Sequence, residues 1–160
     1  MKSNYSILTN FFINDKETLQ RMKDSLDSFK SANSQKWIVN IRGKYKDQTR
    51  SYIENLLGSK CKITHYDFKD WQKETKIIIN EINSDYILYW VEDHILQVDS
   101  KILDEVVNEM KITHSDYLSY TFYCFGYHKN IYDNLKLNCL YKRKHINTFK
   151  LNISSYSKIY

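Results

Sequence analysis

Three adjacent residues, Glu92, Asp93 and His94, carry the side chains best suited to chemistry in this chain. They directly follow residues 86–91, an apolar run of β-branched and aromatic residues that is short enough for a buried strand. In an extended chain the side chains at i and i+2 leave the same face, so Glu92 and His94 can hold one ion between them. A carboxylate and an imidazole suit Mn²⁺ or another first-row cation, whereas Mg²⁺ prefers oxygen ligands. The alternative is a strand that runs out into solvent, where charged residues are common.

Length and composition predict one globular domain. The chain has 160 residues, of which 42% are apolar, and no run approaches the roughly 20 apolar residues of a membrane helix. We expect residues 1–126 to form the main α/β domain and residues 127–160 to extend it. The first residues lack the features of a signal peptide, so we expect a cytoplasmic protein. Cys61, Cys124 and Cys139 are odd in number and widely spaced, which indicates neither a disulfide framework nor a structural zinc site.

The net charge of +5 is concentrated toward the C-terminal third, where Lys142, Arg143, Lys144 and His145 follow one another. Such a cluster can meet phosphates, an anionic membrane surface or nucleic acid, or it can be a solvated loop. No signature of a nucleic-acid-binding fold accompanies it, so we expect no nucleic-acid partner. A peripheral membrane contact through this basic tail stays open.

The hydrophobic pattern switches repeatedly between the periods of a strand and of a helix. Strands are expected at residues 5–11, 36–41, 61–68, 86–91 and 116–123. Helices are expected to begin at Asn14, at Asp47, at Asp70 and at Asp99 or Ser100, and the second to end at Gly58. This order predicts an α/β fold of the Rossmann-like kind, a mostly parallel, doubly wound sheet with helices on both faces.

In open parallel sheets, ligands bind beyond the carboxyl ends of the strands. The expected ends lie at residues 9–11, 40–43, 66–68 and 92–94 and should meet at one edge of the sheet. The chain contains neither GxGxxG nor GxxxxGK[ST], so a glycine-rich phosphate loop is not supported. A site for a diphosphate then needs another counter-charge, which a divalent cation at the end of the fourth strand would supply.

Several segments resemble the nucleotide-binding half of GT-A-fold glycosyltransferases close to family 2. Residues 83–94, Asn-Ser-Asp-Tyr-Ile-Leu-Tyr-Trp-Val-Glu-Asp-His, are similar to the segment that leads into the DxD motif of that family. Residues 77–82 stand where the family places the helix before this strand, and Asp47-Gln48-Thr49 resembles its D-x-T. The resemblance covers roughly residues 4–125.

The resemblance implies that a sugar is transferred from a nucleotide-diphosphate donor to the hydroxyl of a glycan or lipid-linked acceptor, as in polysaccharide biosynthesis. Glu92 and His94 would bind the cofactor, Mn²⁺ or Mg²⁺, and Asp93, the middle residue, would reach the ribose. Thr9 and Asn10, at the end of the first strand, would border the base and ribose.

The chain departs from the family in two places. Where the family usually has an aspartate at the end of the second strand, this chain has Ile41-Arg42-Gly43. Arg42 cannot accept hydrogen bonds from a base or ribose, so it would pair with a phosphate, or Asp67 would take over the base contact. The acceptor-binding half of the family is longer than residues 127–160, where Asp133 is the single carboxylate, so we expect a truncated domain and identify no catalytic base.

Two other classes of function remain open. In a non-catalytic α/β binding or interaction module, Glu92 and His94 would be polar residues at a strand end, and exposed tyrosines would form the interface. A metal-dependent hydrolase or nucleotidyltransferase would need further carboxylates at the same edge, for which Asp67 is the obvious candidate.

Overall fold

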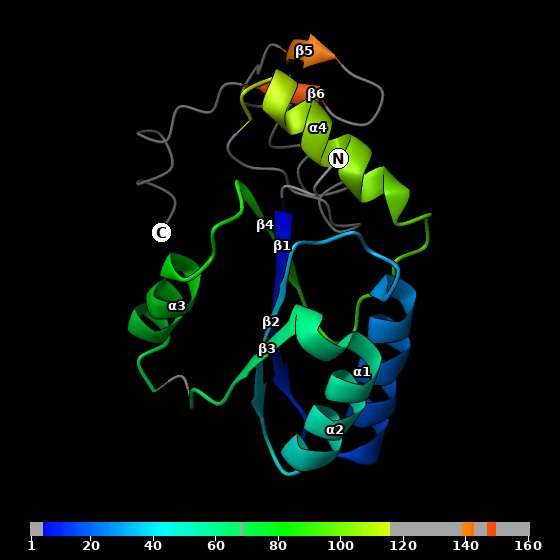
Figure 1. The fold of residues 1–160 in the computed structure, drawn as a ribbon, viewed down its shortest axis with the longest axis vertical. Helices are drawn as coiled ribbons and strands as arrows, with labels where there is room; N and C mark the ends of the chain where they lie inside the picture. Colours follow the sequence, from blue (N-terminus) through cyan, green and yellow to red (C-terminus); the bar gives the residue numbers. More distant parts are fainter. Residues whose placement is uncertain (1–4, 68, 116–138, 143–146, 150–160) are drawn as a thin grey trace, which may run out of the picture. The chain divides into compact units, whose positions relative to one another are not determined.

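The first unit of the chain is built on a parallel sheet. The computed structural model describes residues 5–67, 69–115, 139–142 and 147–149. It divides the chain into two compact units, Met1–Asp104 and Glu105–Tyr160. The first unit contains a four-stranded, all-parallel sheet of order β3-β2-β1-β4 (Figure 1). Its strands are β1 (Tyr5–Phe12), β2 (Trp37–Arg42), β3 (Cys61–Thr64) and β4 (Tyr86–Trp90).

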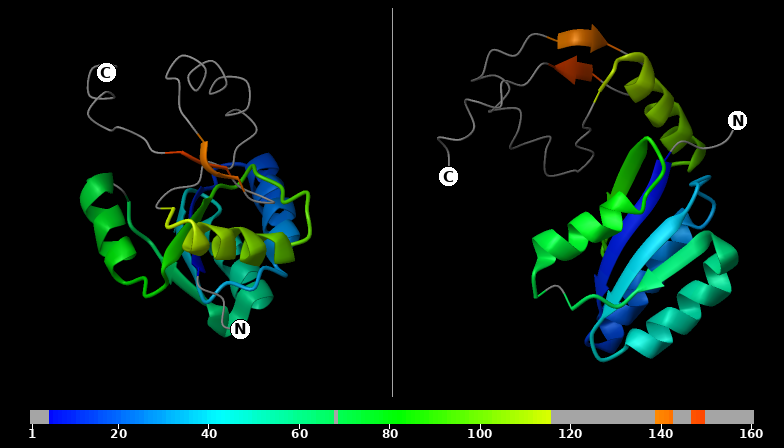
Figure 2. Two further views of the ribbon diagram at one scale, coloured as in Figure 1. Left: turned by 90° about the horizontal axis from the view of Figure 1, so that it is seen from above. Right: turned by 60° about the vertical axis from the view of Figure 1, so that its left-hand side comes forward.

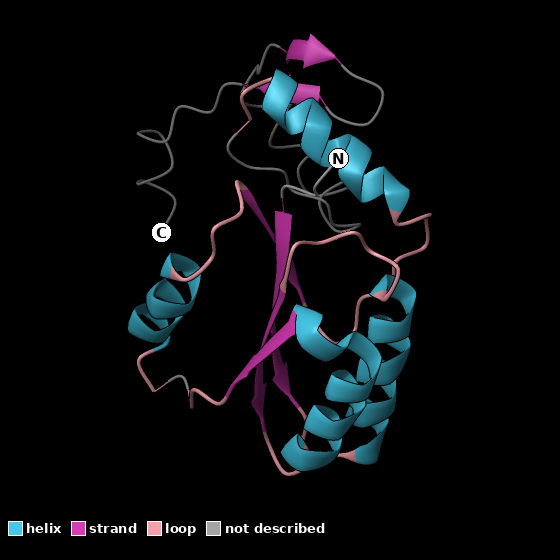
Figure 3. Ribbon diagram, viewed as in Figure 1, coloured by secondary structure: helices cyan, strands magenta, loops and turns pink. Residues whose placement is uncertain are grey.

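Helices cover both faces of this sheet (Figures 1 and 3). Helices α1 (Lys16–Phe29) and α2 (Lys46–Leu57) lie on one face and α3 (Trp71–Asn80) on the other, as the right-hand view of Figure 2 also shows. The predicted α/β class with a doubly wound parallel sheet is therefore confirmed. The chain runs from β1 outward to β3 and returns through α3 to the other side of β1, so the winding direction reverses between β1 and β4. In open α/β sheets ligands bind beyond the carboxyl ends of the strands at such a reversal.

Helix α4 (Lys101–Ile112) spans the division between the two units. In the second unit β5 (Cys139–Lys142) and β6 (Asn147–Phe149) pair antiparallel. The predicted strand at residues 116–123, Asp133, and Arg143, Lys144 and His145 of the basic tail lie outside the described residues. Among the described helices, none has the length and apolar character needed to cross a bilayer.

The core is deepest between the sheet and helices α1 and α2. Helix α1 buries Met22, Leu26 and Phe29 completely, at the i, i+4, i+7 spacing of one helix face. The opposite face of the sheet carries a smaller cluster, in which Leu8 and Ile38 pack against Ile78 of α3, with Tyr66 and Ile82 partly buried beside them. Helix α3 therefore covers its face less completely.

The structure corrects two predicted helix starts. Asp15, not Asn14, caps α1, because its carboxylate accepts a hydrogen bond from the backbone N of Thr18 at 2.7 Å. The Asn14 side chain instead accepts a hydrogen bond from the backbone N of Lys44. Asp47 does not cap α2 but lies in its first turn, since Tyr45 occupies the N-cap position. The predicted cap Asp70 and the predicted stop at Gly58 are confirmed.

Strands β3 and β4 are shorter than predicted. Strand β3 ends at Thr64 rather than at residue 68, because the backbone N and O of Tyr66 bond to the side chain of Asn40 instead of to a neighbouring strand. Strand β4 ends at Trp90, one residue early.

Candidate functional site

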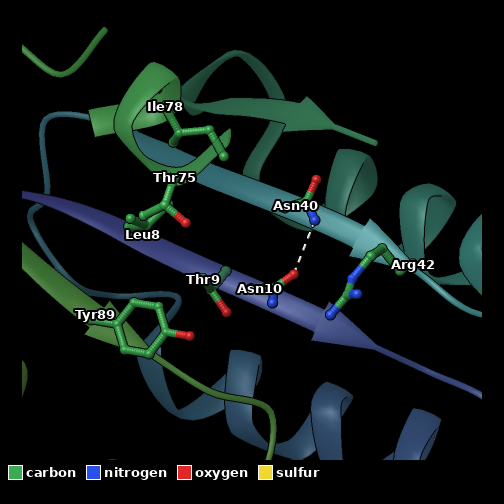
Figure 4. Close-up of a pocket in the computed structure, with 8 residues that line it drawn as sticks. All are labelled: Leu8, Thr9, Asn10, Asn40, Arg42, Thr75, Ile78 and Tyr89. Atoms are coloured by element: carbon green, nitrogen blue, oxygen red, sulfur yellow. Dashed lines mark hydrogen bonds between the residues drawn. The ribbon is translucent and has the colours of Figure 1, made fainter. Parts of the chain in front are cut away.

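A cavity of about 420 Å³ lies on the α3 face of the sheet, toward the carboxyl ends of β1 and β2 (Figure 4). Its wall is formed by eight residues from three strands and one helix: Leu8, Thr9, Asn10, Asn40, Arg42, Thr75, Ile78 and Tyr89. Leu8 and Ile78 make one end apolar, whereas Asn10, Asn40 and Arg42 make the other end polar (Figure 4).

Strand alternation and register bring these residues together. Leu8 and Asn10 are two residues apart on β1, as are Asn40 and Arg42 on β2, so each pair faces the same side of the sheet. The parallel pairing sets Asn10 directly beside Asn40. On the edge strand β4, Tyr89 stands opposite Leu8 and is 60% exposed, so its ring is open to solvent.

The buried Asn40 amide organises the polar end of the cavity. Its Nδ2 donates to Asn10 Oδ1 and to the carbonyl oxygen of Tyr66, both at 3.0 Å. Its Oδ1 accepts from Thr64 Oγ1 at 3.0 Å and from the backbone N of Tyr66 at 2.8 Å. Two donor hydrogens and two acceptor sites are all an asparagine side chain has, so Asn40 is saturated and held rigidly.

Two of the contacts that Arg42 makes hold it at the carboxyl end of the cavity. Its Nη1 donates to the carbonyl oxygen of Asp67 at 3.2 Å, and its guanidinium carbon lies 5.0 Å from the centre of the Phe12 ring. Asp67 thus contributes its main chain to this end of the site, while the residue is exposed and not part of the cavity wall.

The metal-like triplet adopts a different geometry from the one assumed for a strand end. Glu92 and Asp93 form a turn, and the backbone N of His94 donates to the carbonyl oxygen of Val91 at 3.4 Å. The relation of i and i+2 in an extended strand therefore does not apply to Glu92 and His94. Instead, His94 Nδ1 lies 2.8 Å from Asp93 Oδ1, and the imidazole packs edge-on against the Trp90 indole.

Serines of α1 and of the turn after it hold the chain that follows β4. Ser25 Oγ accepts from Trp90 Nε1 at 2.8 Å and lies 3.4 Å from the carbonyl oxygen of Val91, to which it donates. Ser28 Oγ accepts from the backbone N of Leu96 at 2.9 Å, and Ser31 Oγ donates to Ser100 Oγ at 3.1 Å. Residues 91–100 therefore run along α1 and the turn that follows it, on the opposite side of the sheet from α3, and Glu92 and Asp93 form a turn at the start of this path.

Apart from Asp67, the predicted site residues consequently fall into two groups. Thr9, Asn10 and Arg42 are all part of the cavity wall, although the Thr9 side chain, between Leu8 and Asn10 on β1, is completely buried and faces the α1 side of the sheet. Glu92, Asp93 and His94 are not part of that wall. Within residues 5–67 and 69–115 and the two short strands that follow, no three His, Cys, Asp or Glu side chains come together in a group able to hold a metal ion.

Five residues of the wall were not predicted as site residues: Leu8, Asn40, Thr75, Ile78 and Tyr89. For Asn40 the sequence holds a usable signal, because an amide inside the apolar strand Trp37-Ile38-Val39-Asn40-Ile41 must find partners if it is buried. For Thr75 and Ile78 the signal is absent, because only the path of the chain places α3 over this part of the sheet.

Protein-family models, curated protein sequences and solved structures were compared with the chain, and none of them matches it.

Proposed function

We propose that the chain binds a nucleotide-diphosphate sugar and transfers the sugar to an acceptor hydroxyl, as a glycosyltransferase domain of the GT-A class. The observation that carries this proposal is the cavity, which combines an apolar end with a fixed amide and a guanidinium toward the carboxyl ends of β1 and β2. It lies beside the reversal of winding between β1 and β4, where open α/β sheets bind their ligands. Its volume is within the range of small-molecule sites.

The two ends of the cavity suit the two halves of a nucleotide. At the apolar end the exposed ring of Tyr89 can stack on a base, while Leu8 and Ile78, only 6% and 2% exposed, make that end of the wall apolar. Asn10 and Arg42 offer hydrogen-bond donors at the other end. The same proposal includes a glycan or lipid-linked acceptor, a cytoplasmic location and a membrane contact through the basic tail. It includes no nucleic-acid partner.

Metal dependence is a separate part of the proposal and rests on Glu92 and His94. The contact between His94 Nδ1 and Asp93 would orient the imidazole so that Nε2 faces a metal ion, as a carboxylate does beside many metal-bound histidines. The described residues do not supply the three side chains of a complete protein site, so we assign no step of the transfer to the ion. Because Glu92 and His94 are not part of the cavity wall, a bound Mn²⁺ or Mg²⁺ would supply positive charge only to a departing diphosphate that extends beyond the wall, past the end of β4.

One observation favours a second function, a non-catalytic binding module. Phe12, Ile87 and Tyr89 are 51%, 37% and 60% exposed, on strands that line or adjoin the cavity. Exposed apolar side chains that gather near a cavity are a common mark of a contact with another molecule.

Calorimetric titration of UDP, GDP and their sugars, with and without Mn²⁺, tests the proposal on the wild-type chain and on His94→Ala. We expect binding by at least one nucleotide and a Mn²⁺-dependent part of the affinity that His94→Ala weakens by more than about tenfold. The matched control is His114→Asn, which removes an exposed imidazole and tolerates the positive φ of 51° at that position. If the nucleotide affinity is the same with and without Mn²⁺, the metal is not part of the site. If no nucleotide binds, the non-catalytic binding module is the better supported function.

A further inference from the structure

The hydrogen-bonding direction at the polar end of the cavity is fixed by the main chain. The two ends of a side-chain amide are nearly equal in shape, so their direction follows from their partners. A backbone N–H can only donate and a backbone carbonyl can only accept. Because Asn40 meets both groups of Tyr66, its Oδ1 must face the Tyr66 N–H and its Nδ2 must face the Tyr66 oxygen.

The orientation of the Asn40 amide also fixes the orientation of the Asn10 amide. The second hydrogen of Asn40 Nδ2 points at the Asn10 side chain, so an acceptor, Oδ1, must lie there. The Nδ2 of Asn10 then lies on the side of its amide away from Asn40 (Figure 4), and in the part of the chain that the structure describes it has no hydrogen-bond acceptor. Asn10 therefore offers donor hydrogens to a ligand, and it cannot flip without placing two donors against each other.

A positive charge accompanies these donors. Arg42 lies at the same end of the cavity on the neighbouring strand (Figure 4), and its contacts with Asp67 and Phe12 hold the guanidinium there. Asn40 has no acceptor capacity left for a ligand, since Thr64 and Tyr66 already use its Oδ1. A ligand group that carries only acceptors and a negative charge fits this end, whereas a group with outward N–H donors would meet unfavourable contacts.

We infer that the polar end of this cavity binds the diphosphate of the nucleotide, with Asn10 Nδ2 and the Arg42 guanidinium as its donors. The inference deepens the proposed function and rests on it for the nucleotide, but the anion site itself can be tested alone. The base then occupies the apolar end, where it would stack on the exposed Tyr89 ring.

Asn10→Asp is the most direct test. Its carboxylate keeps an oxygen for Asn40 Nδ2, so the buried network is preserved, while the donor toward the ligand becomes a negative acceptor. We expect the affinities for inorganic diphosphate and for UDP, measured by calorimetry both in EDTA and with Mn²⁺, to fall at least about tenfold, the effect of losing one charge-assisted hydrogen bond. Asn55→Asp makes the same change at an exposed position of α2 and should leave both affinities unaltered. Arg42→Gln is the second variant. It should lower the affinities for both ligands in the same way, and it tests the site even if Asn10→Asp does not fold.

The ligands separate this inference from the proposed function. Diphosphate binding that Asn10→Asp weakens supports the anion site even where UDP fails to bind, a result that would count against the nucleotide. If uridine and UDP bind equally well and diphosphate does not bind, the inference is overturned and the nucleotide proposal survives. Equal diphosphate binding by the wild type and both variants also overturns the inference, and no binding by any of these ligands overturns both.

Discussion

A single buried amide shapes both the sheet and the site. Asn40 is completely buried on a central strand, where an unsatisfied polar group would cost about 1–3 kcal/mol. It is satisfied by taking the backbone groups of Tyr66, and this exchange ends β3 at Thr64. The same amide sets the direction of Asn10, so the end of a strand and the donor character of the cavity have one cause.

A glycine next to the site is required by the backbone. Gly43 follows Arg42 with a φ of 99°, and a Cβ there would collide with the main chain of Ile13. Gly58 also has a positive φ, of 53°, but apart from its chain neighbours and its own helix backbone no atom lies within 4 Å of where its Cβ would be. Alanine at Gly58 would therefore carry the free-energy cost of the backbone conformation alone, whereas alanine at Gly43 would also carry the cost of a collision.

We expect Gly58→Ala to lower the free energy of unfolding by about 1–3 kcal/mol, the cost of placing a Cβ at a φ of 53° and a ψ of −131°, a combination that glycine alone adopts readily. Gly43→Ala should cost more than Gly58→Ala, because the Ile13 backbone must also move. Urea denaturation followed by circular dichroism measures both. Equal losses in the two variants would show that the collision at Ile13 is relieved without cost.

At the scale of elements, α1 acts as the support for the segment after β4. Ser25 lies on the buried face of the helix, between Met22 and Phe29, and its hydroxyl joins the Trp90 indole to the Val91 carbonyl. The Trp90 ring also packs against Phe29. The Glu92–His94 triplet begins directly after Val91, so Ser25 anchors the chain at the point where the triplet starts.

Ser25→Ala should destabilise the protein by about 1–2 kcal/mol, since it removes a partner from two partly buried groups, although alanine is the better helix former. The control is Ser51→Ala on α2, where an exposed hydroxyl bonds only to its own helix at Asp47; its effect should stay within about 0.5 kcal/mol. Unfolding curves report the stability, and Trp fluorescence of the folded state reports the change around Trp90. If the two serine variants were equally stable, Ser25 would not be a support.

The sequence allowed the elements to be predicted better than their ends. Apolar spacing such as Met22, Leu26 and Phe29 identifies a helix locally, and the alternation of strands and helices limits the topology to a parallel sheet. The end of β3 and the start of α1 are set by side chains that hydrogen-bond to the backbone. Hydrophobic periodicity carries no information about such hydrogen bonds. That Thr9, Asn10 and Arg42 lie together could be predicted because strand ends meet at one edge, whereas the hydrogen bond between Ser25 and Val91, just before the turn of the triplet, joins residues far apart in the sequence.

At the scale of the sheet-containing unit, Met1–Asp104, the two faces of the sheet are unequally covered. Helix α1 buries five residues and α2 buries three, whereas among the described side chains of α3 only Ile78 is buried. Ile77 and Ile79 of α3 are 40% and 42% exposed. A helix with so few buried contacts should open locally at a lower free energy than the rest of the unit.

Native-state hydrogen exchange checks this order. We expect the amides of β1 and β2 to be the most protected, those of α1 and α2 next, and those of α3 at least about tenfold less protected than those of α2. Because Thr75 and Ile78 of α3 line the cavity, a bound nucleotide should slow exchange in α3 while leaving α2 nearly unchanged. Equal protection of α2 and α3 without ligand would contradict the claim that the two faces of the sheet are unequally covered. A bound ligand that protects α2 rather than α3 would place its binding site on the other side of the sheet.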